Sequence, residues 1–171
     1  MATSTQIPLA EYLATSYRPD REYIDGEVVE RNMGTWEHGR LQMLLGIWFG
    51  QHEAEWGVMV AAEWRTQVSE TRIRIPDVTV VISGPQTPVL HDAPLLLIEI
   101  LSPDDTYSAT ERKAQDYMRM GVNTVWIIDP ETRTGRMCIG ATWTAATRLE
   151  VPGTPIYVEL PNLFAGLAPT R

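Results

Sequence analysis

Two carboxylates stand in segments of the sequence that are otherwise apolar. Glu99 interrupts the run LLLIEIL at residues 95–101, and Asp77 opens the run DVTVVI at residues 77–82, directly after Pro76. A nearly continuous apolar run is typical of a central strand that is covered on both faces. A carboxylate buried there needs a cation, a proton or several hydrogen-bond donors. The two residues together therefore predict a site for a divalent cation, which binds carboxylate oxygens.

The two carboxylates are expected to share that site, because only the Gly- and Pro-rich loop SGPQTPVLHDAP separates their strands. Antiparallel pairing across this loop brings Asp77 near the Leu101 end of the second strand. If the sum of the paired residue numbers is even, Asp77 and Glu99 project from the same face, about one diagonal step of 7–8 Å apart. Both side chains then reach one ion, and the backbone carbonyl of Ile100 is a candidate for a further ligand.

Lys113 is the only lysine in the chain, whereas 13 of the 14 basic residues are arginine. It borders the apolar stripe of Ala114 and Tyr117 on a helix predicted at residues 106–120. A helix that follows a strand packs back on the sheet, so we expect Lys113 to lie over the end of strand 95–101. An ammonium is a compact charge whose pKa shifts readily, and a guanidinium does not replace it in that role.

The elements that must position these residues follow from the hydrophobic periodicity. Apolar residues at helical spacing predict a helix from about Thr35 to about Glu55, ended by Gly57. Alternating or apolar runs predict strands at 58–68, 72–82, 95–101 and 123–129, with a hairpin hinged at Asp25-Gly26 near the N-terminus. This order of helices and strands predicts an α/β fold in which helices flank a mixed β-sheet.

Length and composition predict a single domain over residues 1–171. The N-terminus lacks a signal-peptide pattern, and no stretch is apolar enough for a membrane span, so we expect a cytoplasmic protein. One cysteine, Cys138, excludes an internal disulfide and a thiolate zinc cluster. The net charge of −8 argues against a protein that coats nucleic acid, although it does not exclude a basic groove.

Several motifs in order resemble one known family. PDV at 76–78, IEILSP at 98–103, ERKAQDY around Lys113 and GVNTVWIIDP at 121–130, with YIDGEVVE at 23–30 before them, are similar to the restriction-endonuclease-like family often called Uma-two. That family belongs to the PD-(D/E)XK nuclease superfamily, and the resemblance covers most of residues 9–140. It implies a restriction-endonuclease-like core of four strands in a mixed sheet, a metal-dependent phosphodiesterase centre and a DNA substrate. It also raises the expectation of a homodimer.

The resemblance also implies roles for individual residues. Asp77 and Glu99 would bind Mg²⁺ or Mn²⁺, and Glu27 would be an additional acidic residue that binds the metal or a water. The superfamily places a lysine two residues after the glutamate, where this chain has Leu101. In the family that it resembles, Lys113 on the next helix takes that place.

Each of these residues also has a structural interpretation. Glu99 would be a buried ion-pair partner of Arg72 or Arg74, and Lys113 a solvated helix charge paired with Asp116. Asp77 alone would be a strand-entry residue, and Glu27 a surface charge of the hairpin. His38, three residues before Leu41 on the buried side of the long helix, would be a packed or capping residue, or would contact substrate.

Three functions remain open at this point. The first is a Mg²⁺-dependent endonuclease-like hydrolase that acts on DNA. The second is a catalytically inactive protein that keeps the nuclease fold as a nucleic-acid or protein binding module, which the missing lysine at position 101 and the net charge of −8 both favour. The third is a hydrolase of a small phosphodiester or nucleotide.

Overall fold

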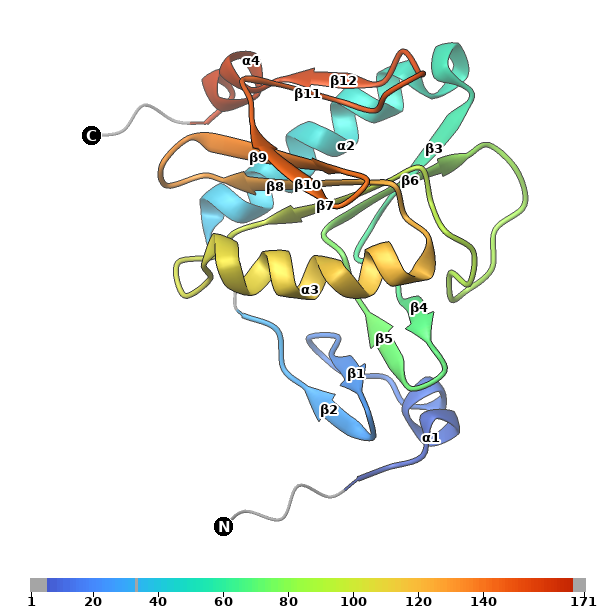
Figure 1. Cartoon of the computed structure of the whole chain (residues 1–171). Coiled ribbons are helices and arrows are strands. Elements are labelled where there is room, and N and C mark those ends of the chain that lie inside the picture. The colour runs from blue at the N-terminus through green and yellow to red at the C-terminus, as the bar shows by residue number, and fades with distance from the viewer. Residues whose placement is uncertain (1–5, 33, 168–171) are drawn as a thin grey trace.

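A central mixed sheet and a smaller second sheet organise the chain (Figure 1). The computed structural model describes residues 6–32 and 34–167. Within those ranges the elements are α1 (Leu9–Ala14), β1 (Glu22–Ile24), β2 (Glu27–Val29), α2 (Trp36–Trp56), β3 (Val58–Ala62), β4 (Thr66–Ser69), β5 (Arg72–Arg74), β6 (Val78–Ile82), β7 (Leu96–Ile100), α3 (Tyr107–Met120), β8 (Thr124–Asp129), β9 (Thr134–Ile139), β10 (Thr142–Ala145), β11 (Arg148–Glu150), β12 (Tyr157–Glu159) and α4 (Leu160–Ala165).

The central sheet has six strands in the order β10-β9-β8-β7-β6-β3. Strands β7 and β8 are parallel, because α3 connects them as a crossover, and the other neighbours are antiparallel. This arrangement confirms the predicted α/β fold with a mixed sheet flanked by helices. The sheet is larger than the four-stranded core that the resemblance implies.

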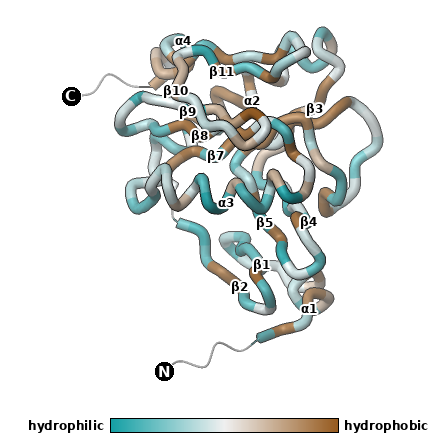
Figure 2. Tube along the Cα trace, in the orientation of Figure 1, coloured by the Kyte–Doolittle hydropathy of each residue, from teal (hydrophilic) through white to brown (hydrophobic). Residues whose placement is uncertain are grey.

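Helix α2 covers one face of the central sheet. Its buried stripe, which includes Leu41, Leu45 and Phe49, packs in one core with Ile98 of β7 and Trp126 of β8. Figure 2 shows hydrophobic residues gathered along the central strands. Because side chains alternate along a strand, the even-numbered residues of β7 face α2.

Helix α3 covers the opposite face. Its residues Ala114 and Tyr117 pack in a second core with Leu97 of β7 and Val125 of β8. The odd-numbered residues of β7 therefore face α3, and Glu99 is one of them. The strand periodicity and the crossover helix together direct Glu99 toward α3.

The second sheet, β2-β1-β5-β4, lies below the central sheet in Figure 1. The predicted strands 58–68 and 72–82 are each divided, so that β3 and β6 belong to the central sheet and β4 and β5 to the second. Glu63 has a positive φ of 50° at the first break, and Pro76, which lacks a backbone N–H, lies in the second. The prediction of two continuous strands was wrong for this reason, and Asp77 lies where the chain enters the central sheet.

The predicted ends of helix α2 are confirmed. The Thr35 hydroxyl accepts a hydrogen bond from the backbone N–H of His38, and Gly57 ends the helix in the left-handed conformation with a φ of 66°. Strands β10 and β11 were not predicted, because they are short and mostly exposed. In the described part of the chain, no helix is both long and apolar enough to cross a membrane.

Candidate active site

The register of β6 and β7 brings the two predicted carboxylates together. Val78 pairs with Ile98, so extending the register by one residue places Asp77 directly opposite Glu99. The expected even register sum is correct, and the extended register makes the two residues direct partners instead of diagonal ones. Asp77 is 3% exposed and Glu99 is 5% exposed. Two buried carboxylates thus meet at the junction of the two sheets.

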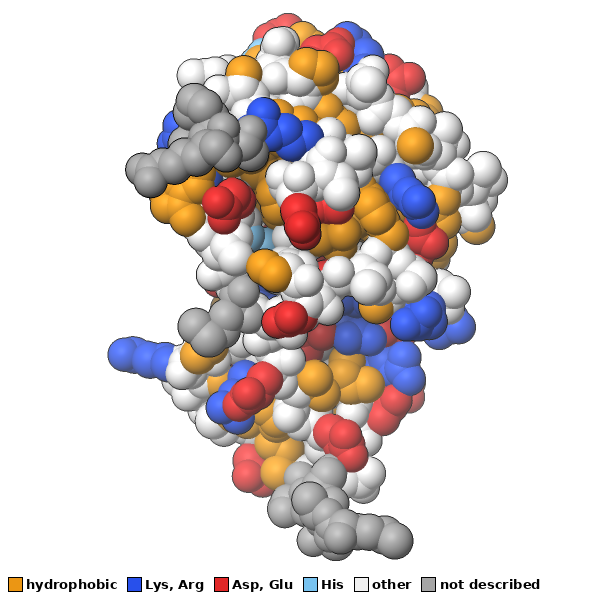
Figure 3. All heavy atoms as spheres, turned by 90° about the vertical axis from the view of Figure 1, so that its left-hand side faces the viewer, with side chains coloured by type: hydrophobic (Ala, Val, Ile, Leu, Met, Phe, Trp, Pro, Cys, Tyr) orange, Lys and Arg blue, Asp and Glu red, His pale blue; other side chains and the backbone are white. Residues whose placement is uncertain are grey.

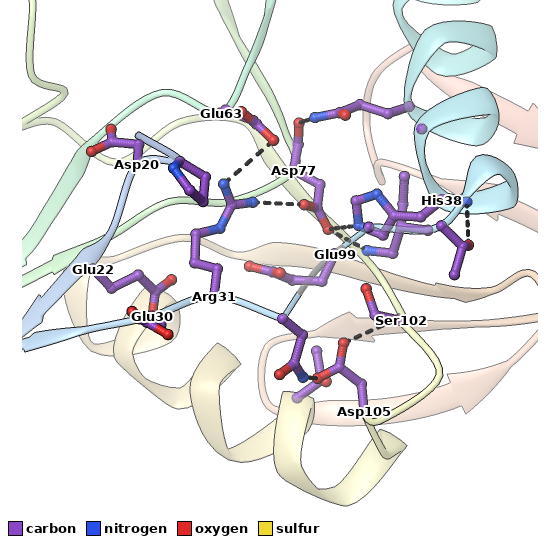
Figure 4. A pocket seen from close by; sticks show the side chains of 18 of the residues that line it. Asp20, Glu22, Glu30, Arg31, His38, Glu63, Asp77, Glu99, Ser102 and Asp105 are labelled. Atoms are coloured by element: carbon purple, nitrogen blue, oxygen red, sulfur yellow. Dashed lines mark hydrogen bonds and ion pairs between the residues drawn. The ribbon is translucent and has the colours of Figure 1, made fainter. Parts of the chain in front are cut away.

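Asp77 is surrounded by hydrogen-bond donors (Figure 4). Its Oδ2 accepts a hydrogen bond of 2.7 Å from the backbone N–H of Ile100 and lies 3.3 Å from Nε2 of His38. Its Oδ1 accepts a hydrogen bond of 3.0 Å from Nη2 of Arg31. Burial raises the pKa of Asp77, but His38, Lys113 and the Ile100 N–H outweigh it and hold that pKa below its usual value. Asp77 is therefore an ionised carboxylate.

Glu99 contacts two groups from α3. Nζ of Lys113 lies 3.0 Å from its Oε1 and 3.1 Å from its Oε2, and the Tyr117 hydroxyl donates a hydrogen bond to Oε1. Burial, reinforced by the charge of Asp77, raises the pKa of Glu99 to about 7 although Lys113 and the Tyr117 hydroxyl oppose the shift. This carboxyl is therefore poised to lose its proton near neutral pH.

The alternative ion pair of Glu99 with Arg72 or Arg74 is not what the structure contains. Nη1 of Arg72 and Nη2 of Arg74 instead lie 2.9 Å and 2.8 Å from the carboxylate of Asp116. These contacts also replace the Lys113–Asp116 pair that we considered. Asp116 therefore anchors the arginines of β5 and leaves Lys113 for the cavity.

Lys113 lies over the end of β7, as its helix position led us to expect. Its ammonium sits between two carboxylates, because Nζ is also 2.9 Å from Oε1 of Glu22. The side chain is 21% exposed, so it is not a solvated helix charge. Burial lowers the pKa of Lys113, but the charges of Glu99, Glu22 and Asp77 raise it above its usual value. The amine consequently stays protonated at neutral pH.

Glu22 is a site residue that sequence reasoning missed. It is 5% exposed on β1 and accepts hydrogen bonds from Nη1 of Arg74 at 2.7 Å and from the Ile75 N–H at 3.1 Å. Burial opposes its ionisation, but Lys113 and Arg74 lower the pKa of Glu22 to about 2. In the sequence Glu22 directly follows Arg21, and adjacent charges are typical of an exposed segment. The local sequence therefore does not mark Glu22 as a buried site residue.

Glu27 does not lie where the resemblance led us to expect it. Its side chain is exposed on β2, and it is not among the described residues that line the cavity beside Asp77 and Glu99. The hairpin register pairs Glu27 with Ile24 at the turn, whereas Glu22 pairs with Val29 at the other end of the hairpin. Glu22 therefore supplies the acidic group from the N-terminal hairpin.

His38 lies in the first turn of helix α2 and has two contacts of different kinds. Its backbone N–H completes the helix cap at Thr35, and its Nε2 approaches Asp77 as described above. Burial lowers the pKa of His38, but the hydrogen bond with Asp77 and its charge raise that pKa above the usual value. The cap is therefore Thr35, which binds the backbone of His38, while the buried His38 side chain is a neighbour of the candidate metal ligand.

A cavity of about 470 Å³ joins these residues. Among the described residues that line it, seven are acidic, two are cationic and one is histidine. The acidic residues are Asp20, Glu22, Glu30, Glu63, Asp77, Glu99 and Asp105, and the cationic residues are Arg31 and Lys113. Figure 3 shows acidic side chains on both sides of the waist between the two sheets. Such a concentration of negative charge attracts cations.

The residues present fit a Mg²⁺ or Mn²⁺ ion. Asp77 and Glu99 offer carboxylate oxygens, and Ile100, which also lines the cavity, offers its backbone carbonyl. In the described residues, no group of three or more His, Cys, Asp or Glu side chains is arranged to hold a metal by itself. Mg²⁺ does not need such a group, because it keeps several waters and binds through one or two carboxylates together with substrate phosphate.

Comparisons with known proteins agree with this architecture. Residues 9–164 match the family described as "Uma2: Putative restriction endonuclease". The chain also resembles the crystal structure of "a putative nuclease belonging to DUF820" from Anabaena variabilis ATCC 29413, with a TM-score of 0.79 and 21% identity over 94% of this chain and 98% of that one. This likeness shows a shared restriction-endonuclease-like fold. No curated protein matches the chain. The match over most of the sequence shows that the chain belongs to the Uma2 family.

Proposed function

We propose that the protein is a Mg²⁺-dependent endonuclease that hydrolyses phosphodiester bonds of DNA. The observation that carries this proposal is the meeting of Asp77 and Glu99, in register and buried, in one acidic cavity beside the Lys113 ammonium. Membership of a nuclease family supports the same reaction class.

Asp77 and Glu99 would hold Mg²⁺, with the carbonyl of Ile100 as a third protein ligand. The ion supplies polarisation of the phosphoryl oxygen and a bound water of lowered pKa. The Ile100 N–H fixes the direction of the Asp77 carboxylate, and the Tyr117 hydroxyl does the same for Glu99. The protein thus presents both carboxylates in a fixed orientation before substrate arrives.

Lys113 would stabilise negative charge on the reacting phosphate. Because its pKa is raised, it holds its proton and does not serve as a general base. Leu101, which occupies the usual lysine position of the superfamily, is buried and donates its N–H to the Ile128 carbonyl at 2.9 Å. Helix α3 therefore supplies the ammonium that β7 lacks.

One observation favours the alternative, a non-catalytic nuclease fold that binds nucleic acid or protein. The Arg31 guanidinium pairs with Asp77 and thereby neutralises a candidate metal ligand without any metal. The two functions differ in a simple property. A catalytic centre binds a divalent cation through Asp77, whereas a binding module does not need one.

Plasmid cleavage tests the proposal. Supercoiled DNA is incubated with the wild type, Asp77→Asn and Glu99→Gln in Mg²⁺, in Mn²⁺ and in chelator. We expect the wild type to nick or linearise the plasmid only with metal, and each variant to lose about 100-fold or more in rate. Arg148→Gln is the matched control, because Arg148 forms an ion pair with Glu159 and does not line the cavity.

Two results would count against the proposal. Absence of cleavage by the wild type in either metal would favour the non-catalytic alternative. Equal cleavage by the wild type and Asp77→Asn would show that the activity does not come from this site. A chromogenic phosphodiester as a second substrate separates DNA cleavage from hydrolysis of small phosphodiesters.

A further inference from the structure

We propose that Arg31 has two roles at this site, first as a cation that competes with the metal for Asp77 and then as a ligand of the substrate phosphate. This inference rests on the proposed function. Arg31 lies in the segment between β2 and α2, and Figure 4 shows its side chain directed toward Asp77 and Glu63. Its side chain is 18% exposed.

The contacts of Asp77 indicate which of its oxygens a metal would bind. Its Oδ2 already accepts the Ile100 N–H and faces His38, so Oδ1 is the oxygen left for a cation. Arg31 holds that oxygen at 3.0 Å. A metal ion that binds Oδ1 therefore competes with the guanidinium for this oxygen. Arg31 thus lowers the apparent affinity of the site for metal, because displacement costs the ion pair.

The other contacts of Arg31 leave it available once it is displaced. Its second partner, Glu63, lies 3.4 Å from Nη1 with a side chain that is 51% exposed, and such pairs hold weakly. Lys113, the other cationic residue among the described residues of the cavity, is held between Glu22 and Glu99 at 2.9–3.1 Å. Arg31 is therefore the cation that is able to turn toward an incoming anion.

A phosphate suits Arg31 both chemically and by position. The guanidinium is a planar fork that binds phosphate oxygens in pairs. A phosphate that shares a metal ion with Asp77 lies beside the guanidinium that contacted the same carboxylate. The cavity is otherwise rich in carboxylates that repel a polyanion, so this cation has a large effect on DNA binding.

The two roles predict opposite effects of one substitution. Arg31→Gln removes the competitor of the metal and also removes the phosphate ligand. Metal affinity should then increase while DNA affinity decreases. A role in stability alone predicts no such opposition, because a loosened site weakens both.

Two binding measurements test this without relying on activity. Calorimetry with Mn²⁺ is performed on the wild type, Arg31→Gln, Arg31→Lys and the control Arg148→Gln. Fluorescence anisotropy with a labelled DNA duplex is performed on the same proteins in Ca²⁺. We expect Arg31→Gln to bind Mn²⁺ about tenfold more tightly and DNA about tenfold more weakly, each equivalent to about 1.4 kcal/mol. Arg148→Gln should match the wild type in both.

Arg31→Lys keeps a charge beside Asp77 and loses the planar fork. We therefore expect it to bind Mn²⁺ as the wild type does and to bind DNA more weakly. This variant also tests the phosphate role if Arg31→Gln does not fold. Thermal melting of each variant identifies a folding defect before the titrations.

The outcomes separate this inference from the proposed function. If the wild type binds Mn²⁺ and Arg31→Gln binds it equally or less tightly, the competitive role is refuted while the metal site stands. If DNA affinity is unchanged in both Arg31 variants, the phosphate role is refuted. If the wild type binds no Mn²⁺, either alone or with the DNA duplex present, the proposed function itself is refuted.

Discussion

The substitution Glu22→Gln tests the buried ion network that joins the second sheet to the candidate site. The Glu22 carboxylate lies 2.7 Å from Nη1 of Arg74 and 2.9 Å from Nζ of Lys113, and it accepts a hydrogen bond of 3.1 Å from the Ile75 N–H. These contacts lower the pKa of Glu22 from 4.5 to about 2 although burial opposes them. The ionised carboxylate is thus favoured in the folded state over the unfolded state.

The magnitude follows from linkage between protonation and folding. A difference of about 2.5 pKa units, each worth 1.36 kcal/mol, corresponds to about 3 kcal/mol. Because the folded pKa is the lower one, this contribution is fully present above pH 4.5 and is lost as the pH falls toward 2. Between about pH 7 and pH 3 the loss amounts to about 2 kcal/mol.

Urea unfolding of the metal-free protein at these two pH values measures the effect. The decrease in the free energy of unfolding from about pH 7 to pH 3 should be about 2 kcal/mol smaller in Glu22→Gln than in the wild type. Because each protein is compared with itself at the two pH values, the pH-independent cost of the substitution cancels. Glu30→Gln is the control, because Glu30 forms an exposed pair with Arg21 that contributes about 1 kcal/mol at most. An identical pH dependence in Glu22→Gln and the wild type would refute the reasoning.

The remaining predictions concern cleavage and metal binding. Lys113→Ala should cleave plasmid about 100-fold more slowly than the wild type, since it removes the charge beside the reacting phosphate, and unchanged activity would remove Lys113 from the mechanism. Glu22→Gln should reduce the cleavage rate about tenfold, because Lys113 then loses one of the two carboxylates that hold its ammonium in place. Glu27→Gln, on the exposed strand, should cleave within about twofold of the wild-type rate. A larger loss in Glu27→Gln than in Glu22→Gln would restore the role first expected for Glu27. Because the pKa of Glu99 is about 7, a proton competes with the metal for this carboxylate at lower pH. Mn²⁺ affinity measured by calorimetry should therefore increase about tenfold for each unit by which the pH is raised toward 7, and should be constant above pH 7. A flat pH profile would contradict ligation by Glu99.

The features that depend on short stretches of sequence could be predicted. The apolar run around Glu99 predicts a buried strand, and the change from alternating to helical periodicity predicts α2 and α3. The meeting of Asp77 and Glu99 follows from the parity of residues on two strands joined by one loop. Each of these inferences uses neighbours in sequence or in one strand pair, where geometry is fixed by the backbone.

The missed features depend on contacts between distant segments. The division of the segments at Glu63 and Pro76 comes from the passage between two sheets, and alternation along a strand does not reveal it. The choice of Glu22 over Glu27 depends on which end of the hairpin approaches α3. Arg31 was not considered as a site residue, because its ion pair joins a loop to a residue 46 positions away.

The most direct test of the account is a crystal structure of the protein grown with Mn²⁺ and measured with anomalous scattering. The account predicts one ion that is bound by the carboxylates of Asp77 and Glu99 and by the carbonyl of Ile100. It also predicts that Arg31 has moved away from Asp77. A structure at saturating Mn²⁺ that has no ion between the two carboxylates, and in which Arg31 still pairs with Asp77, would contradict it.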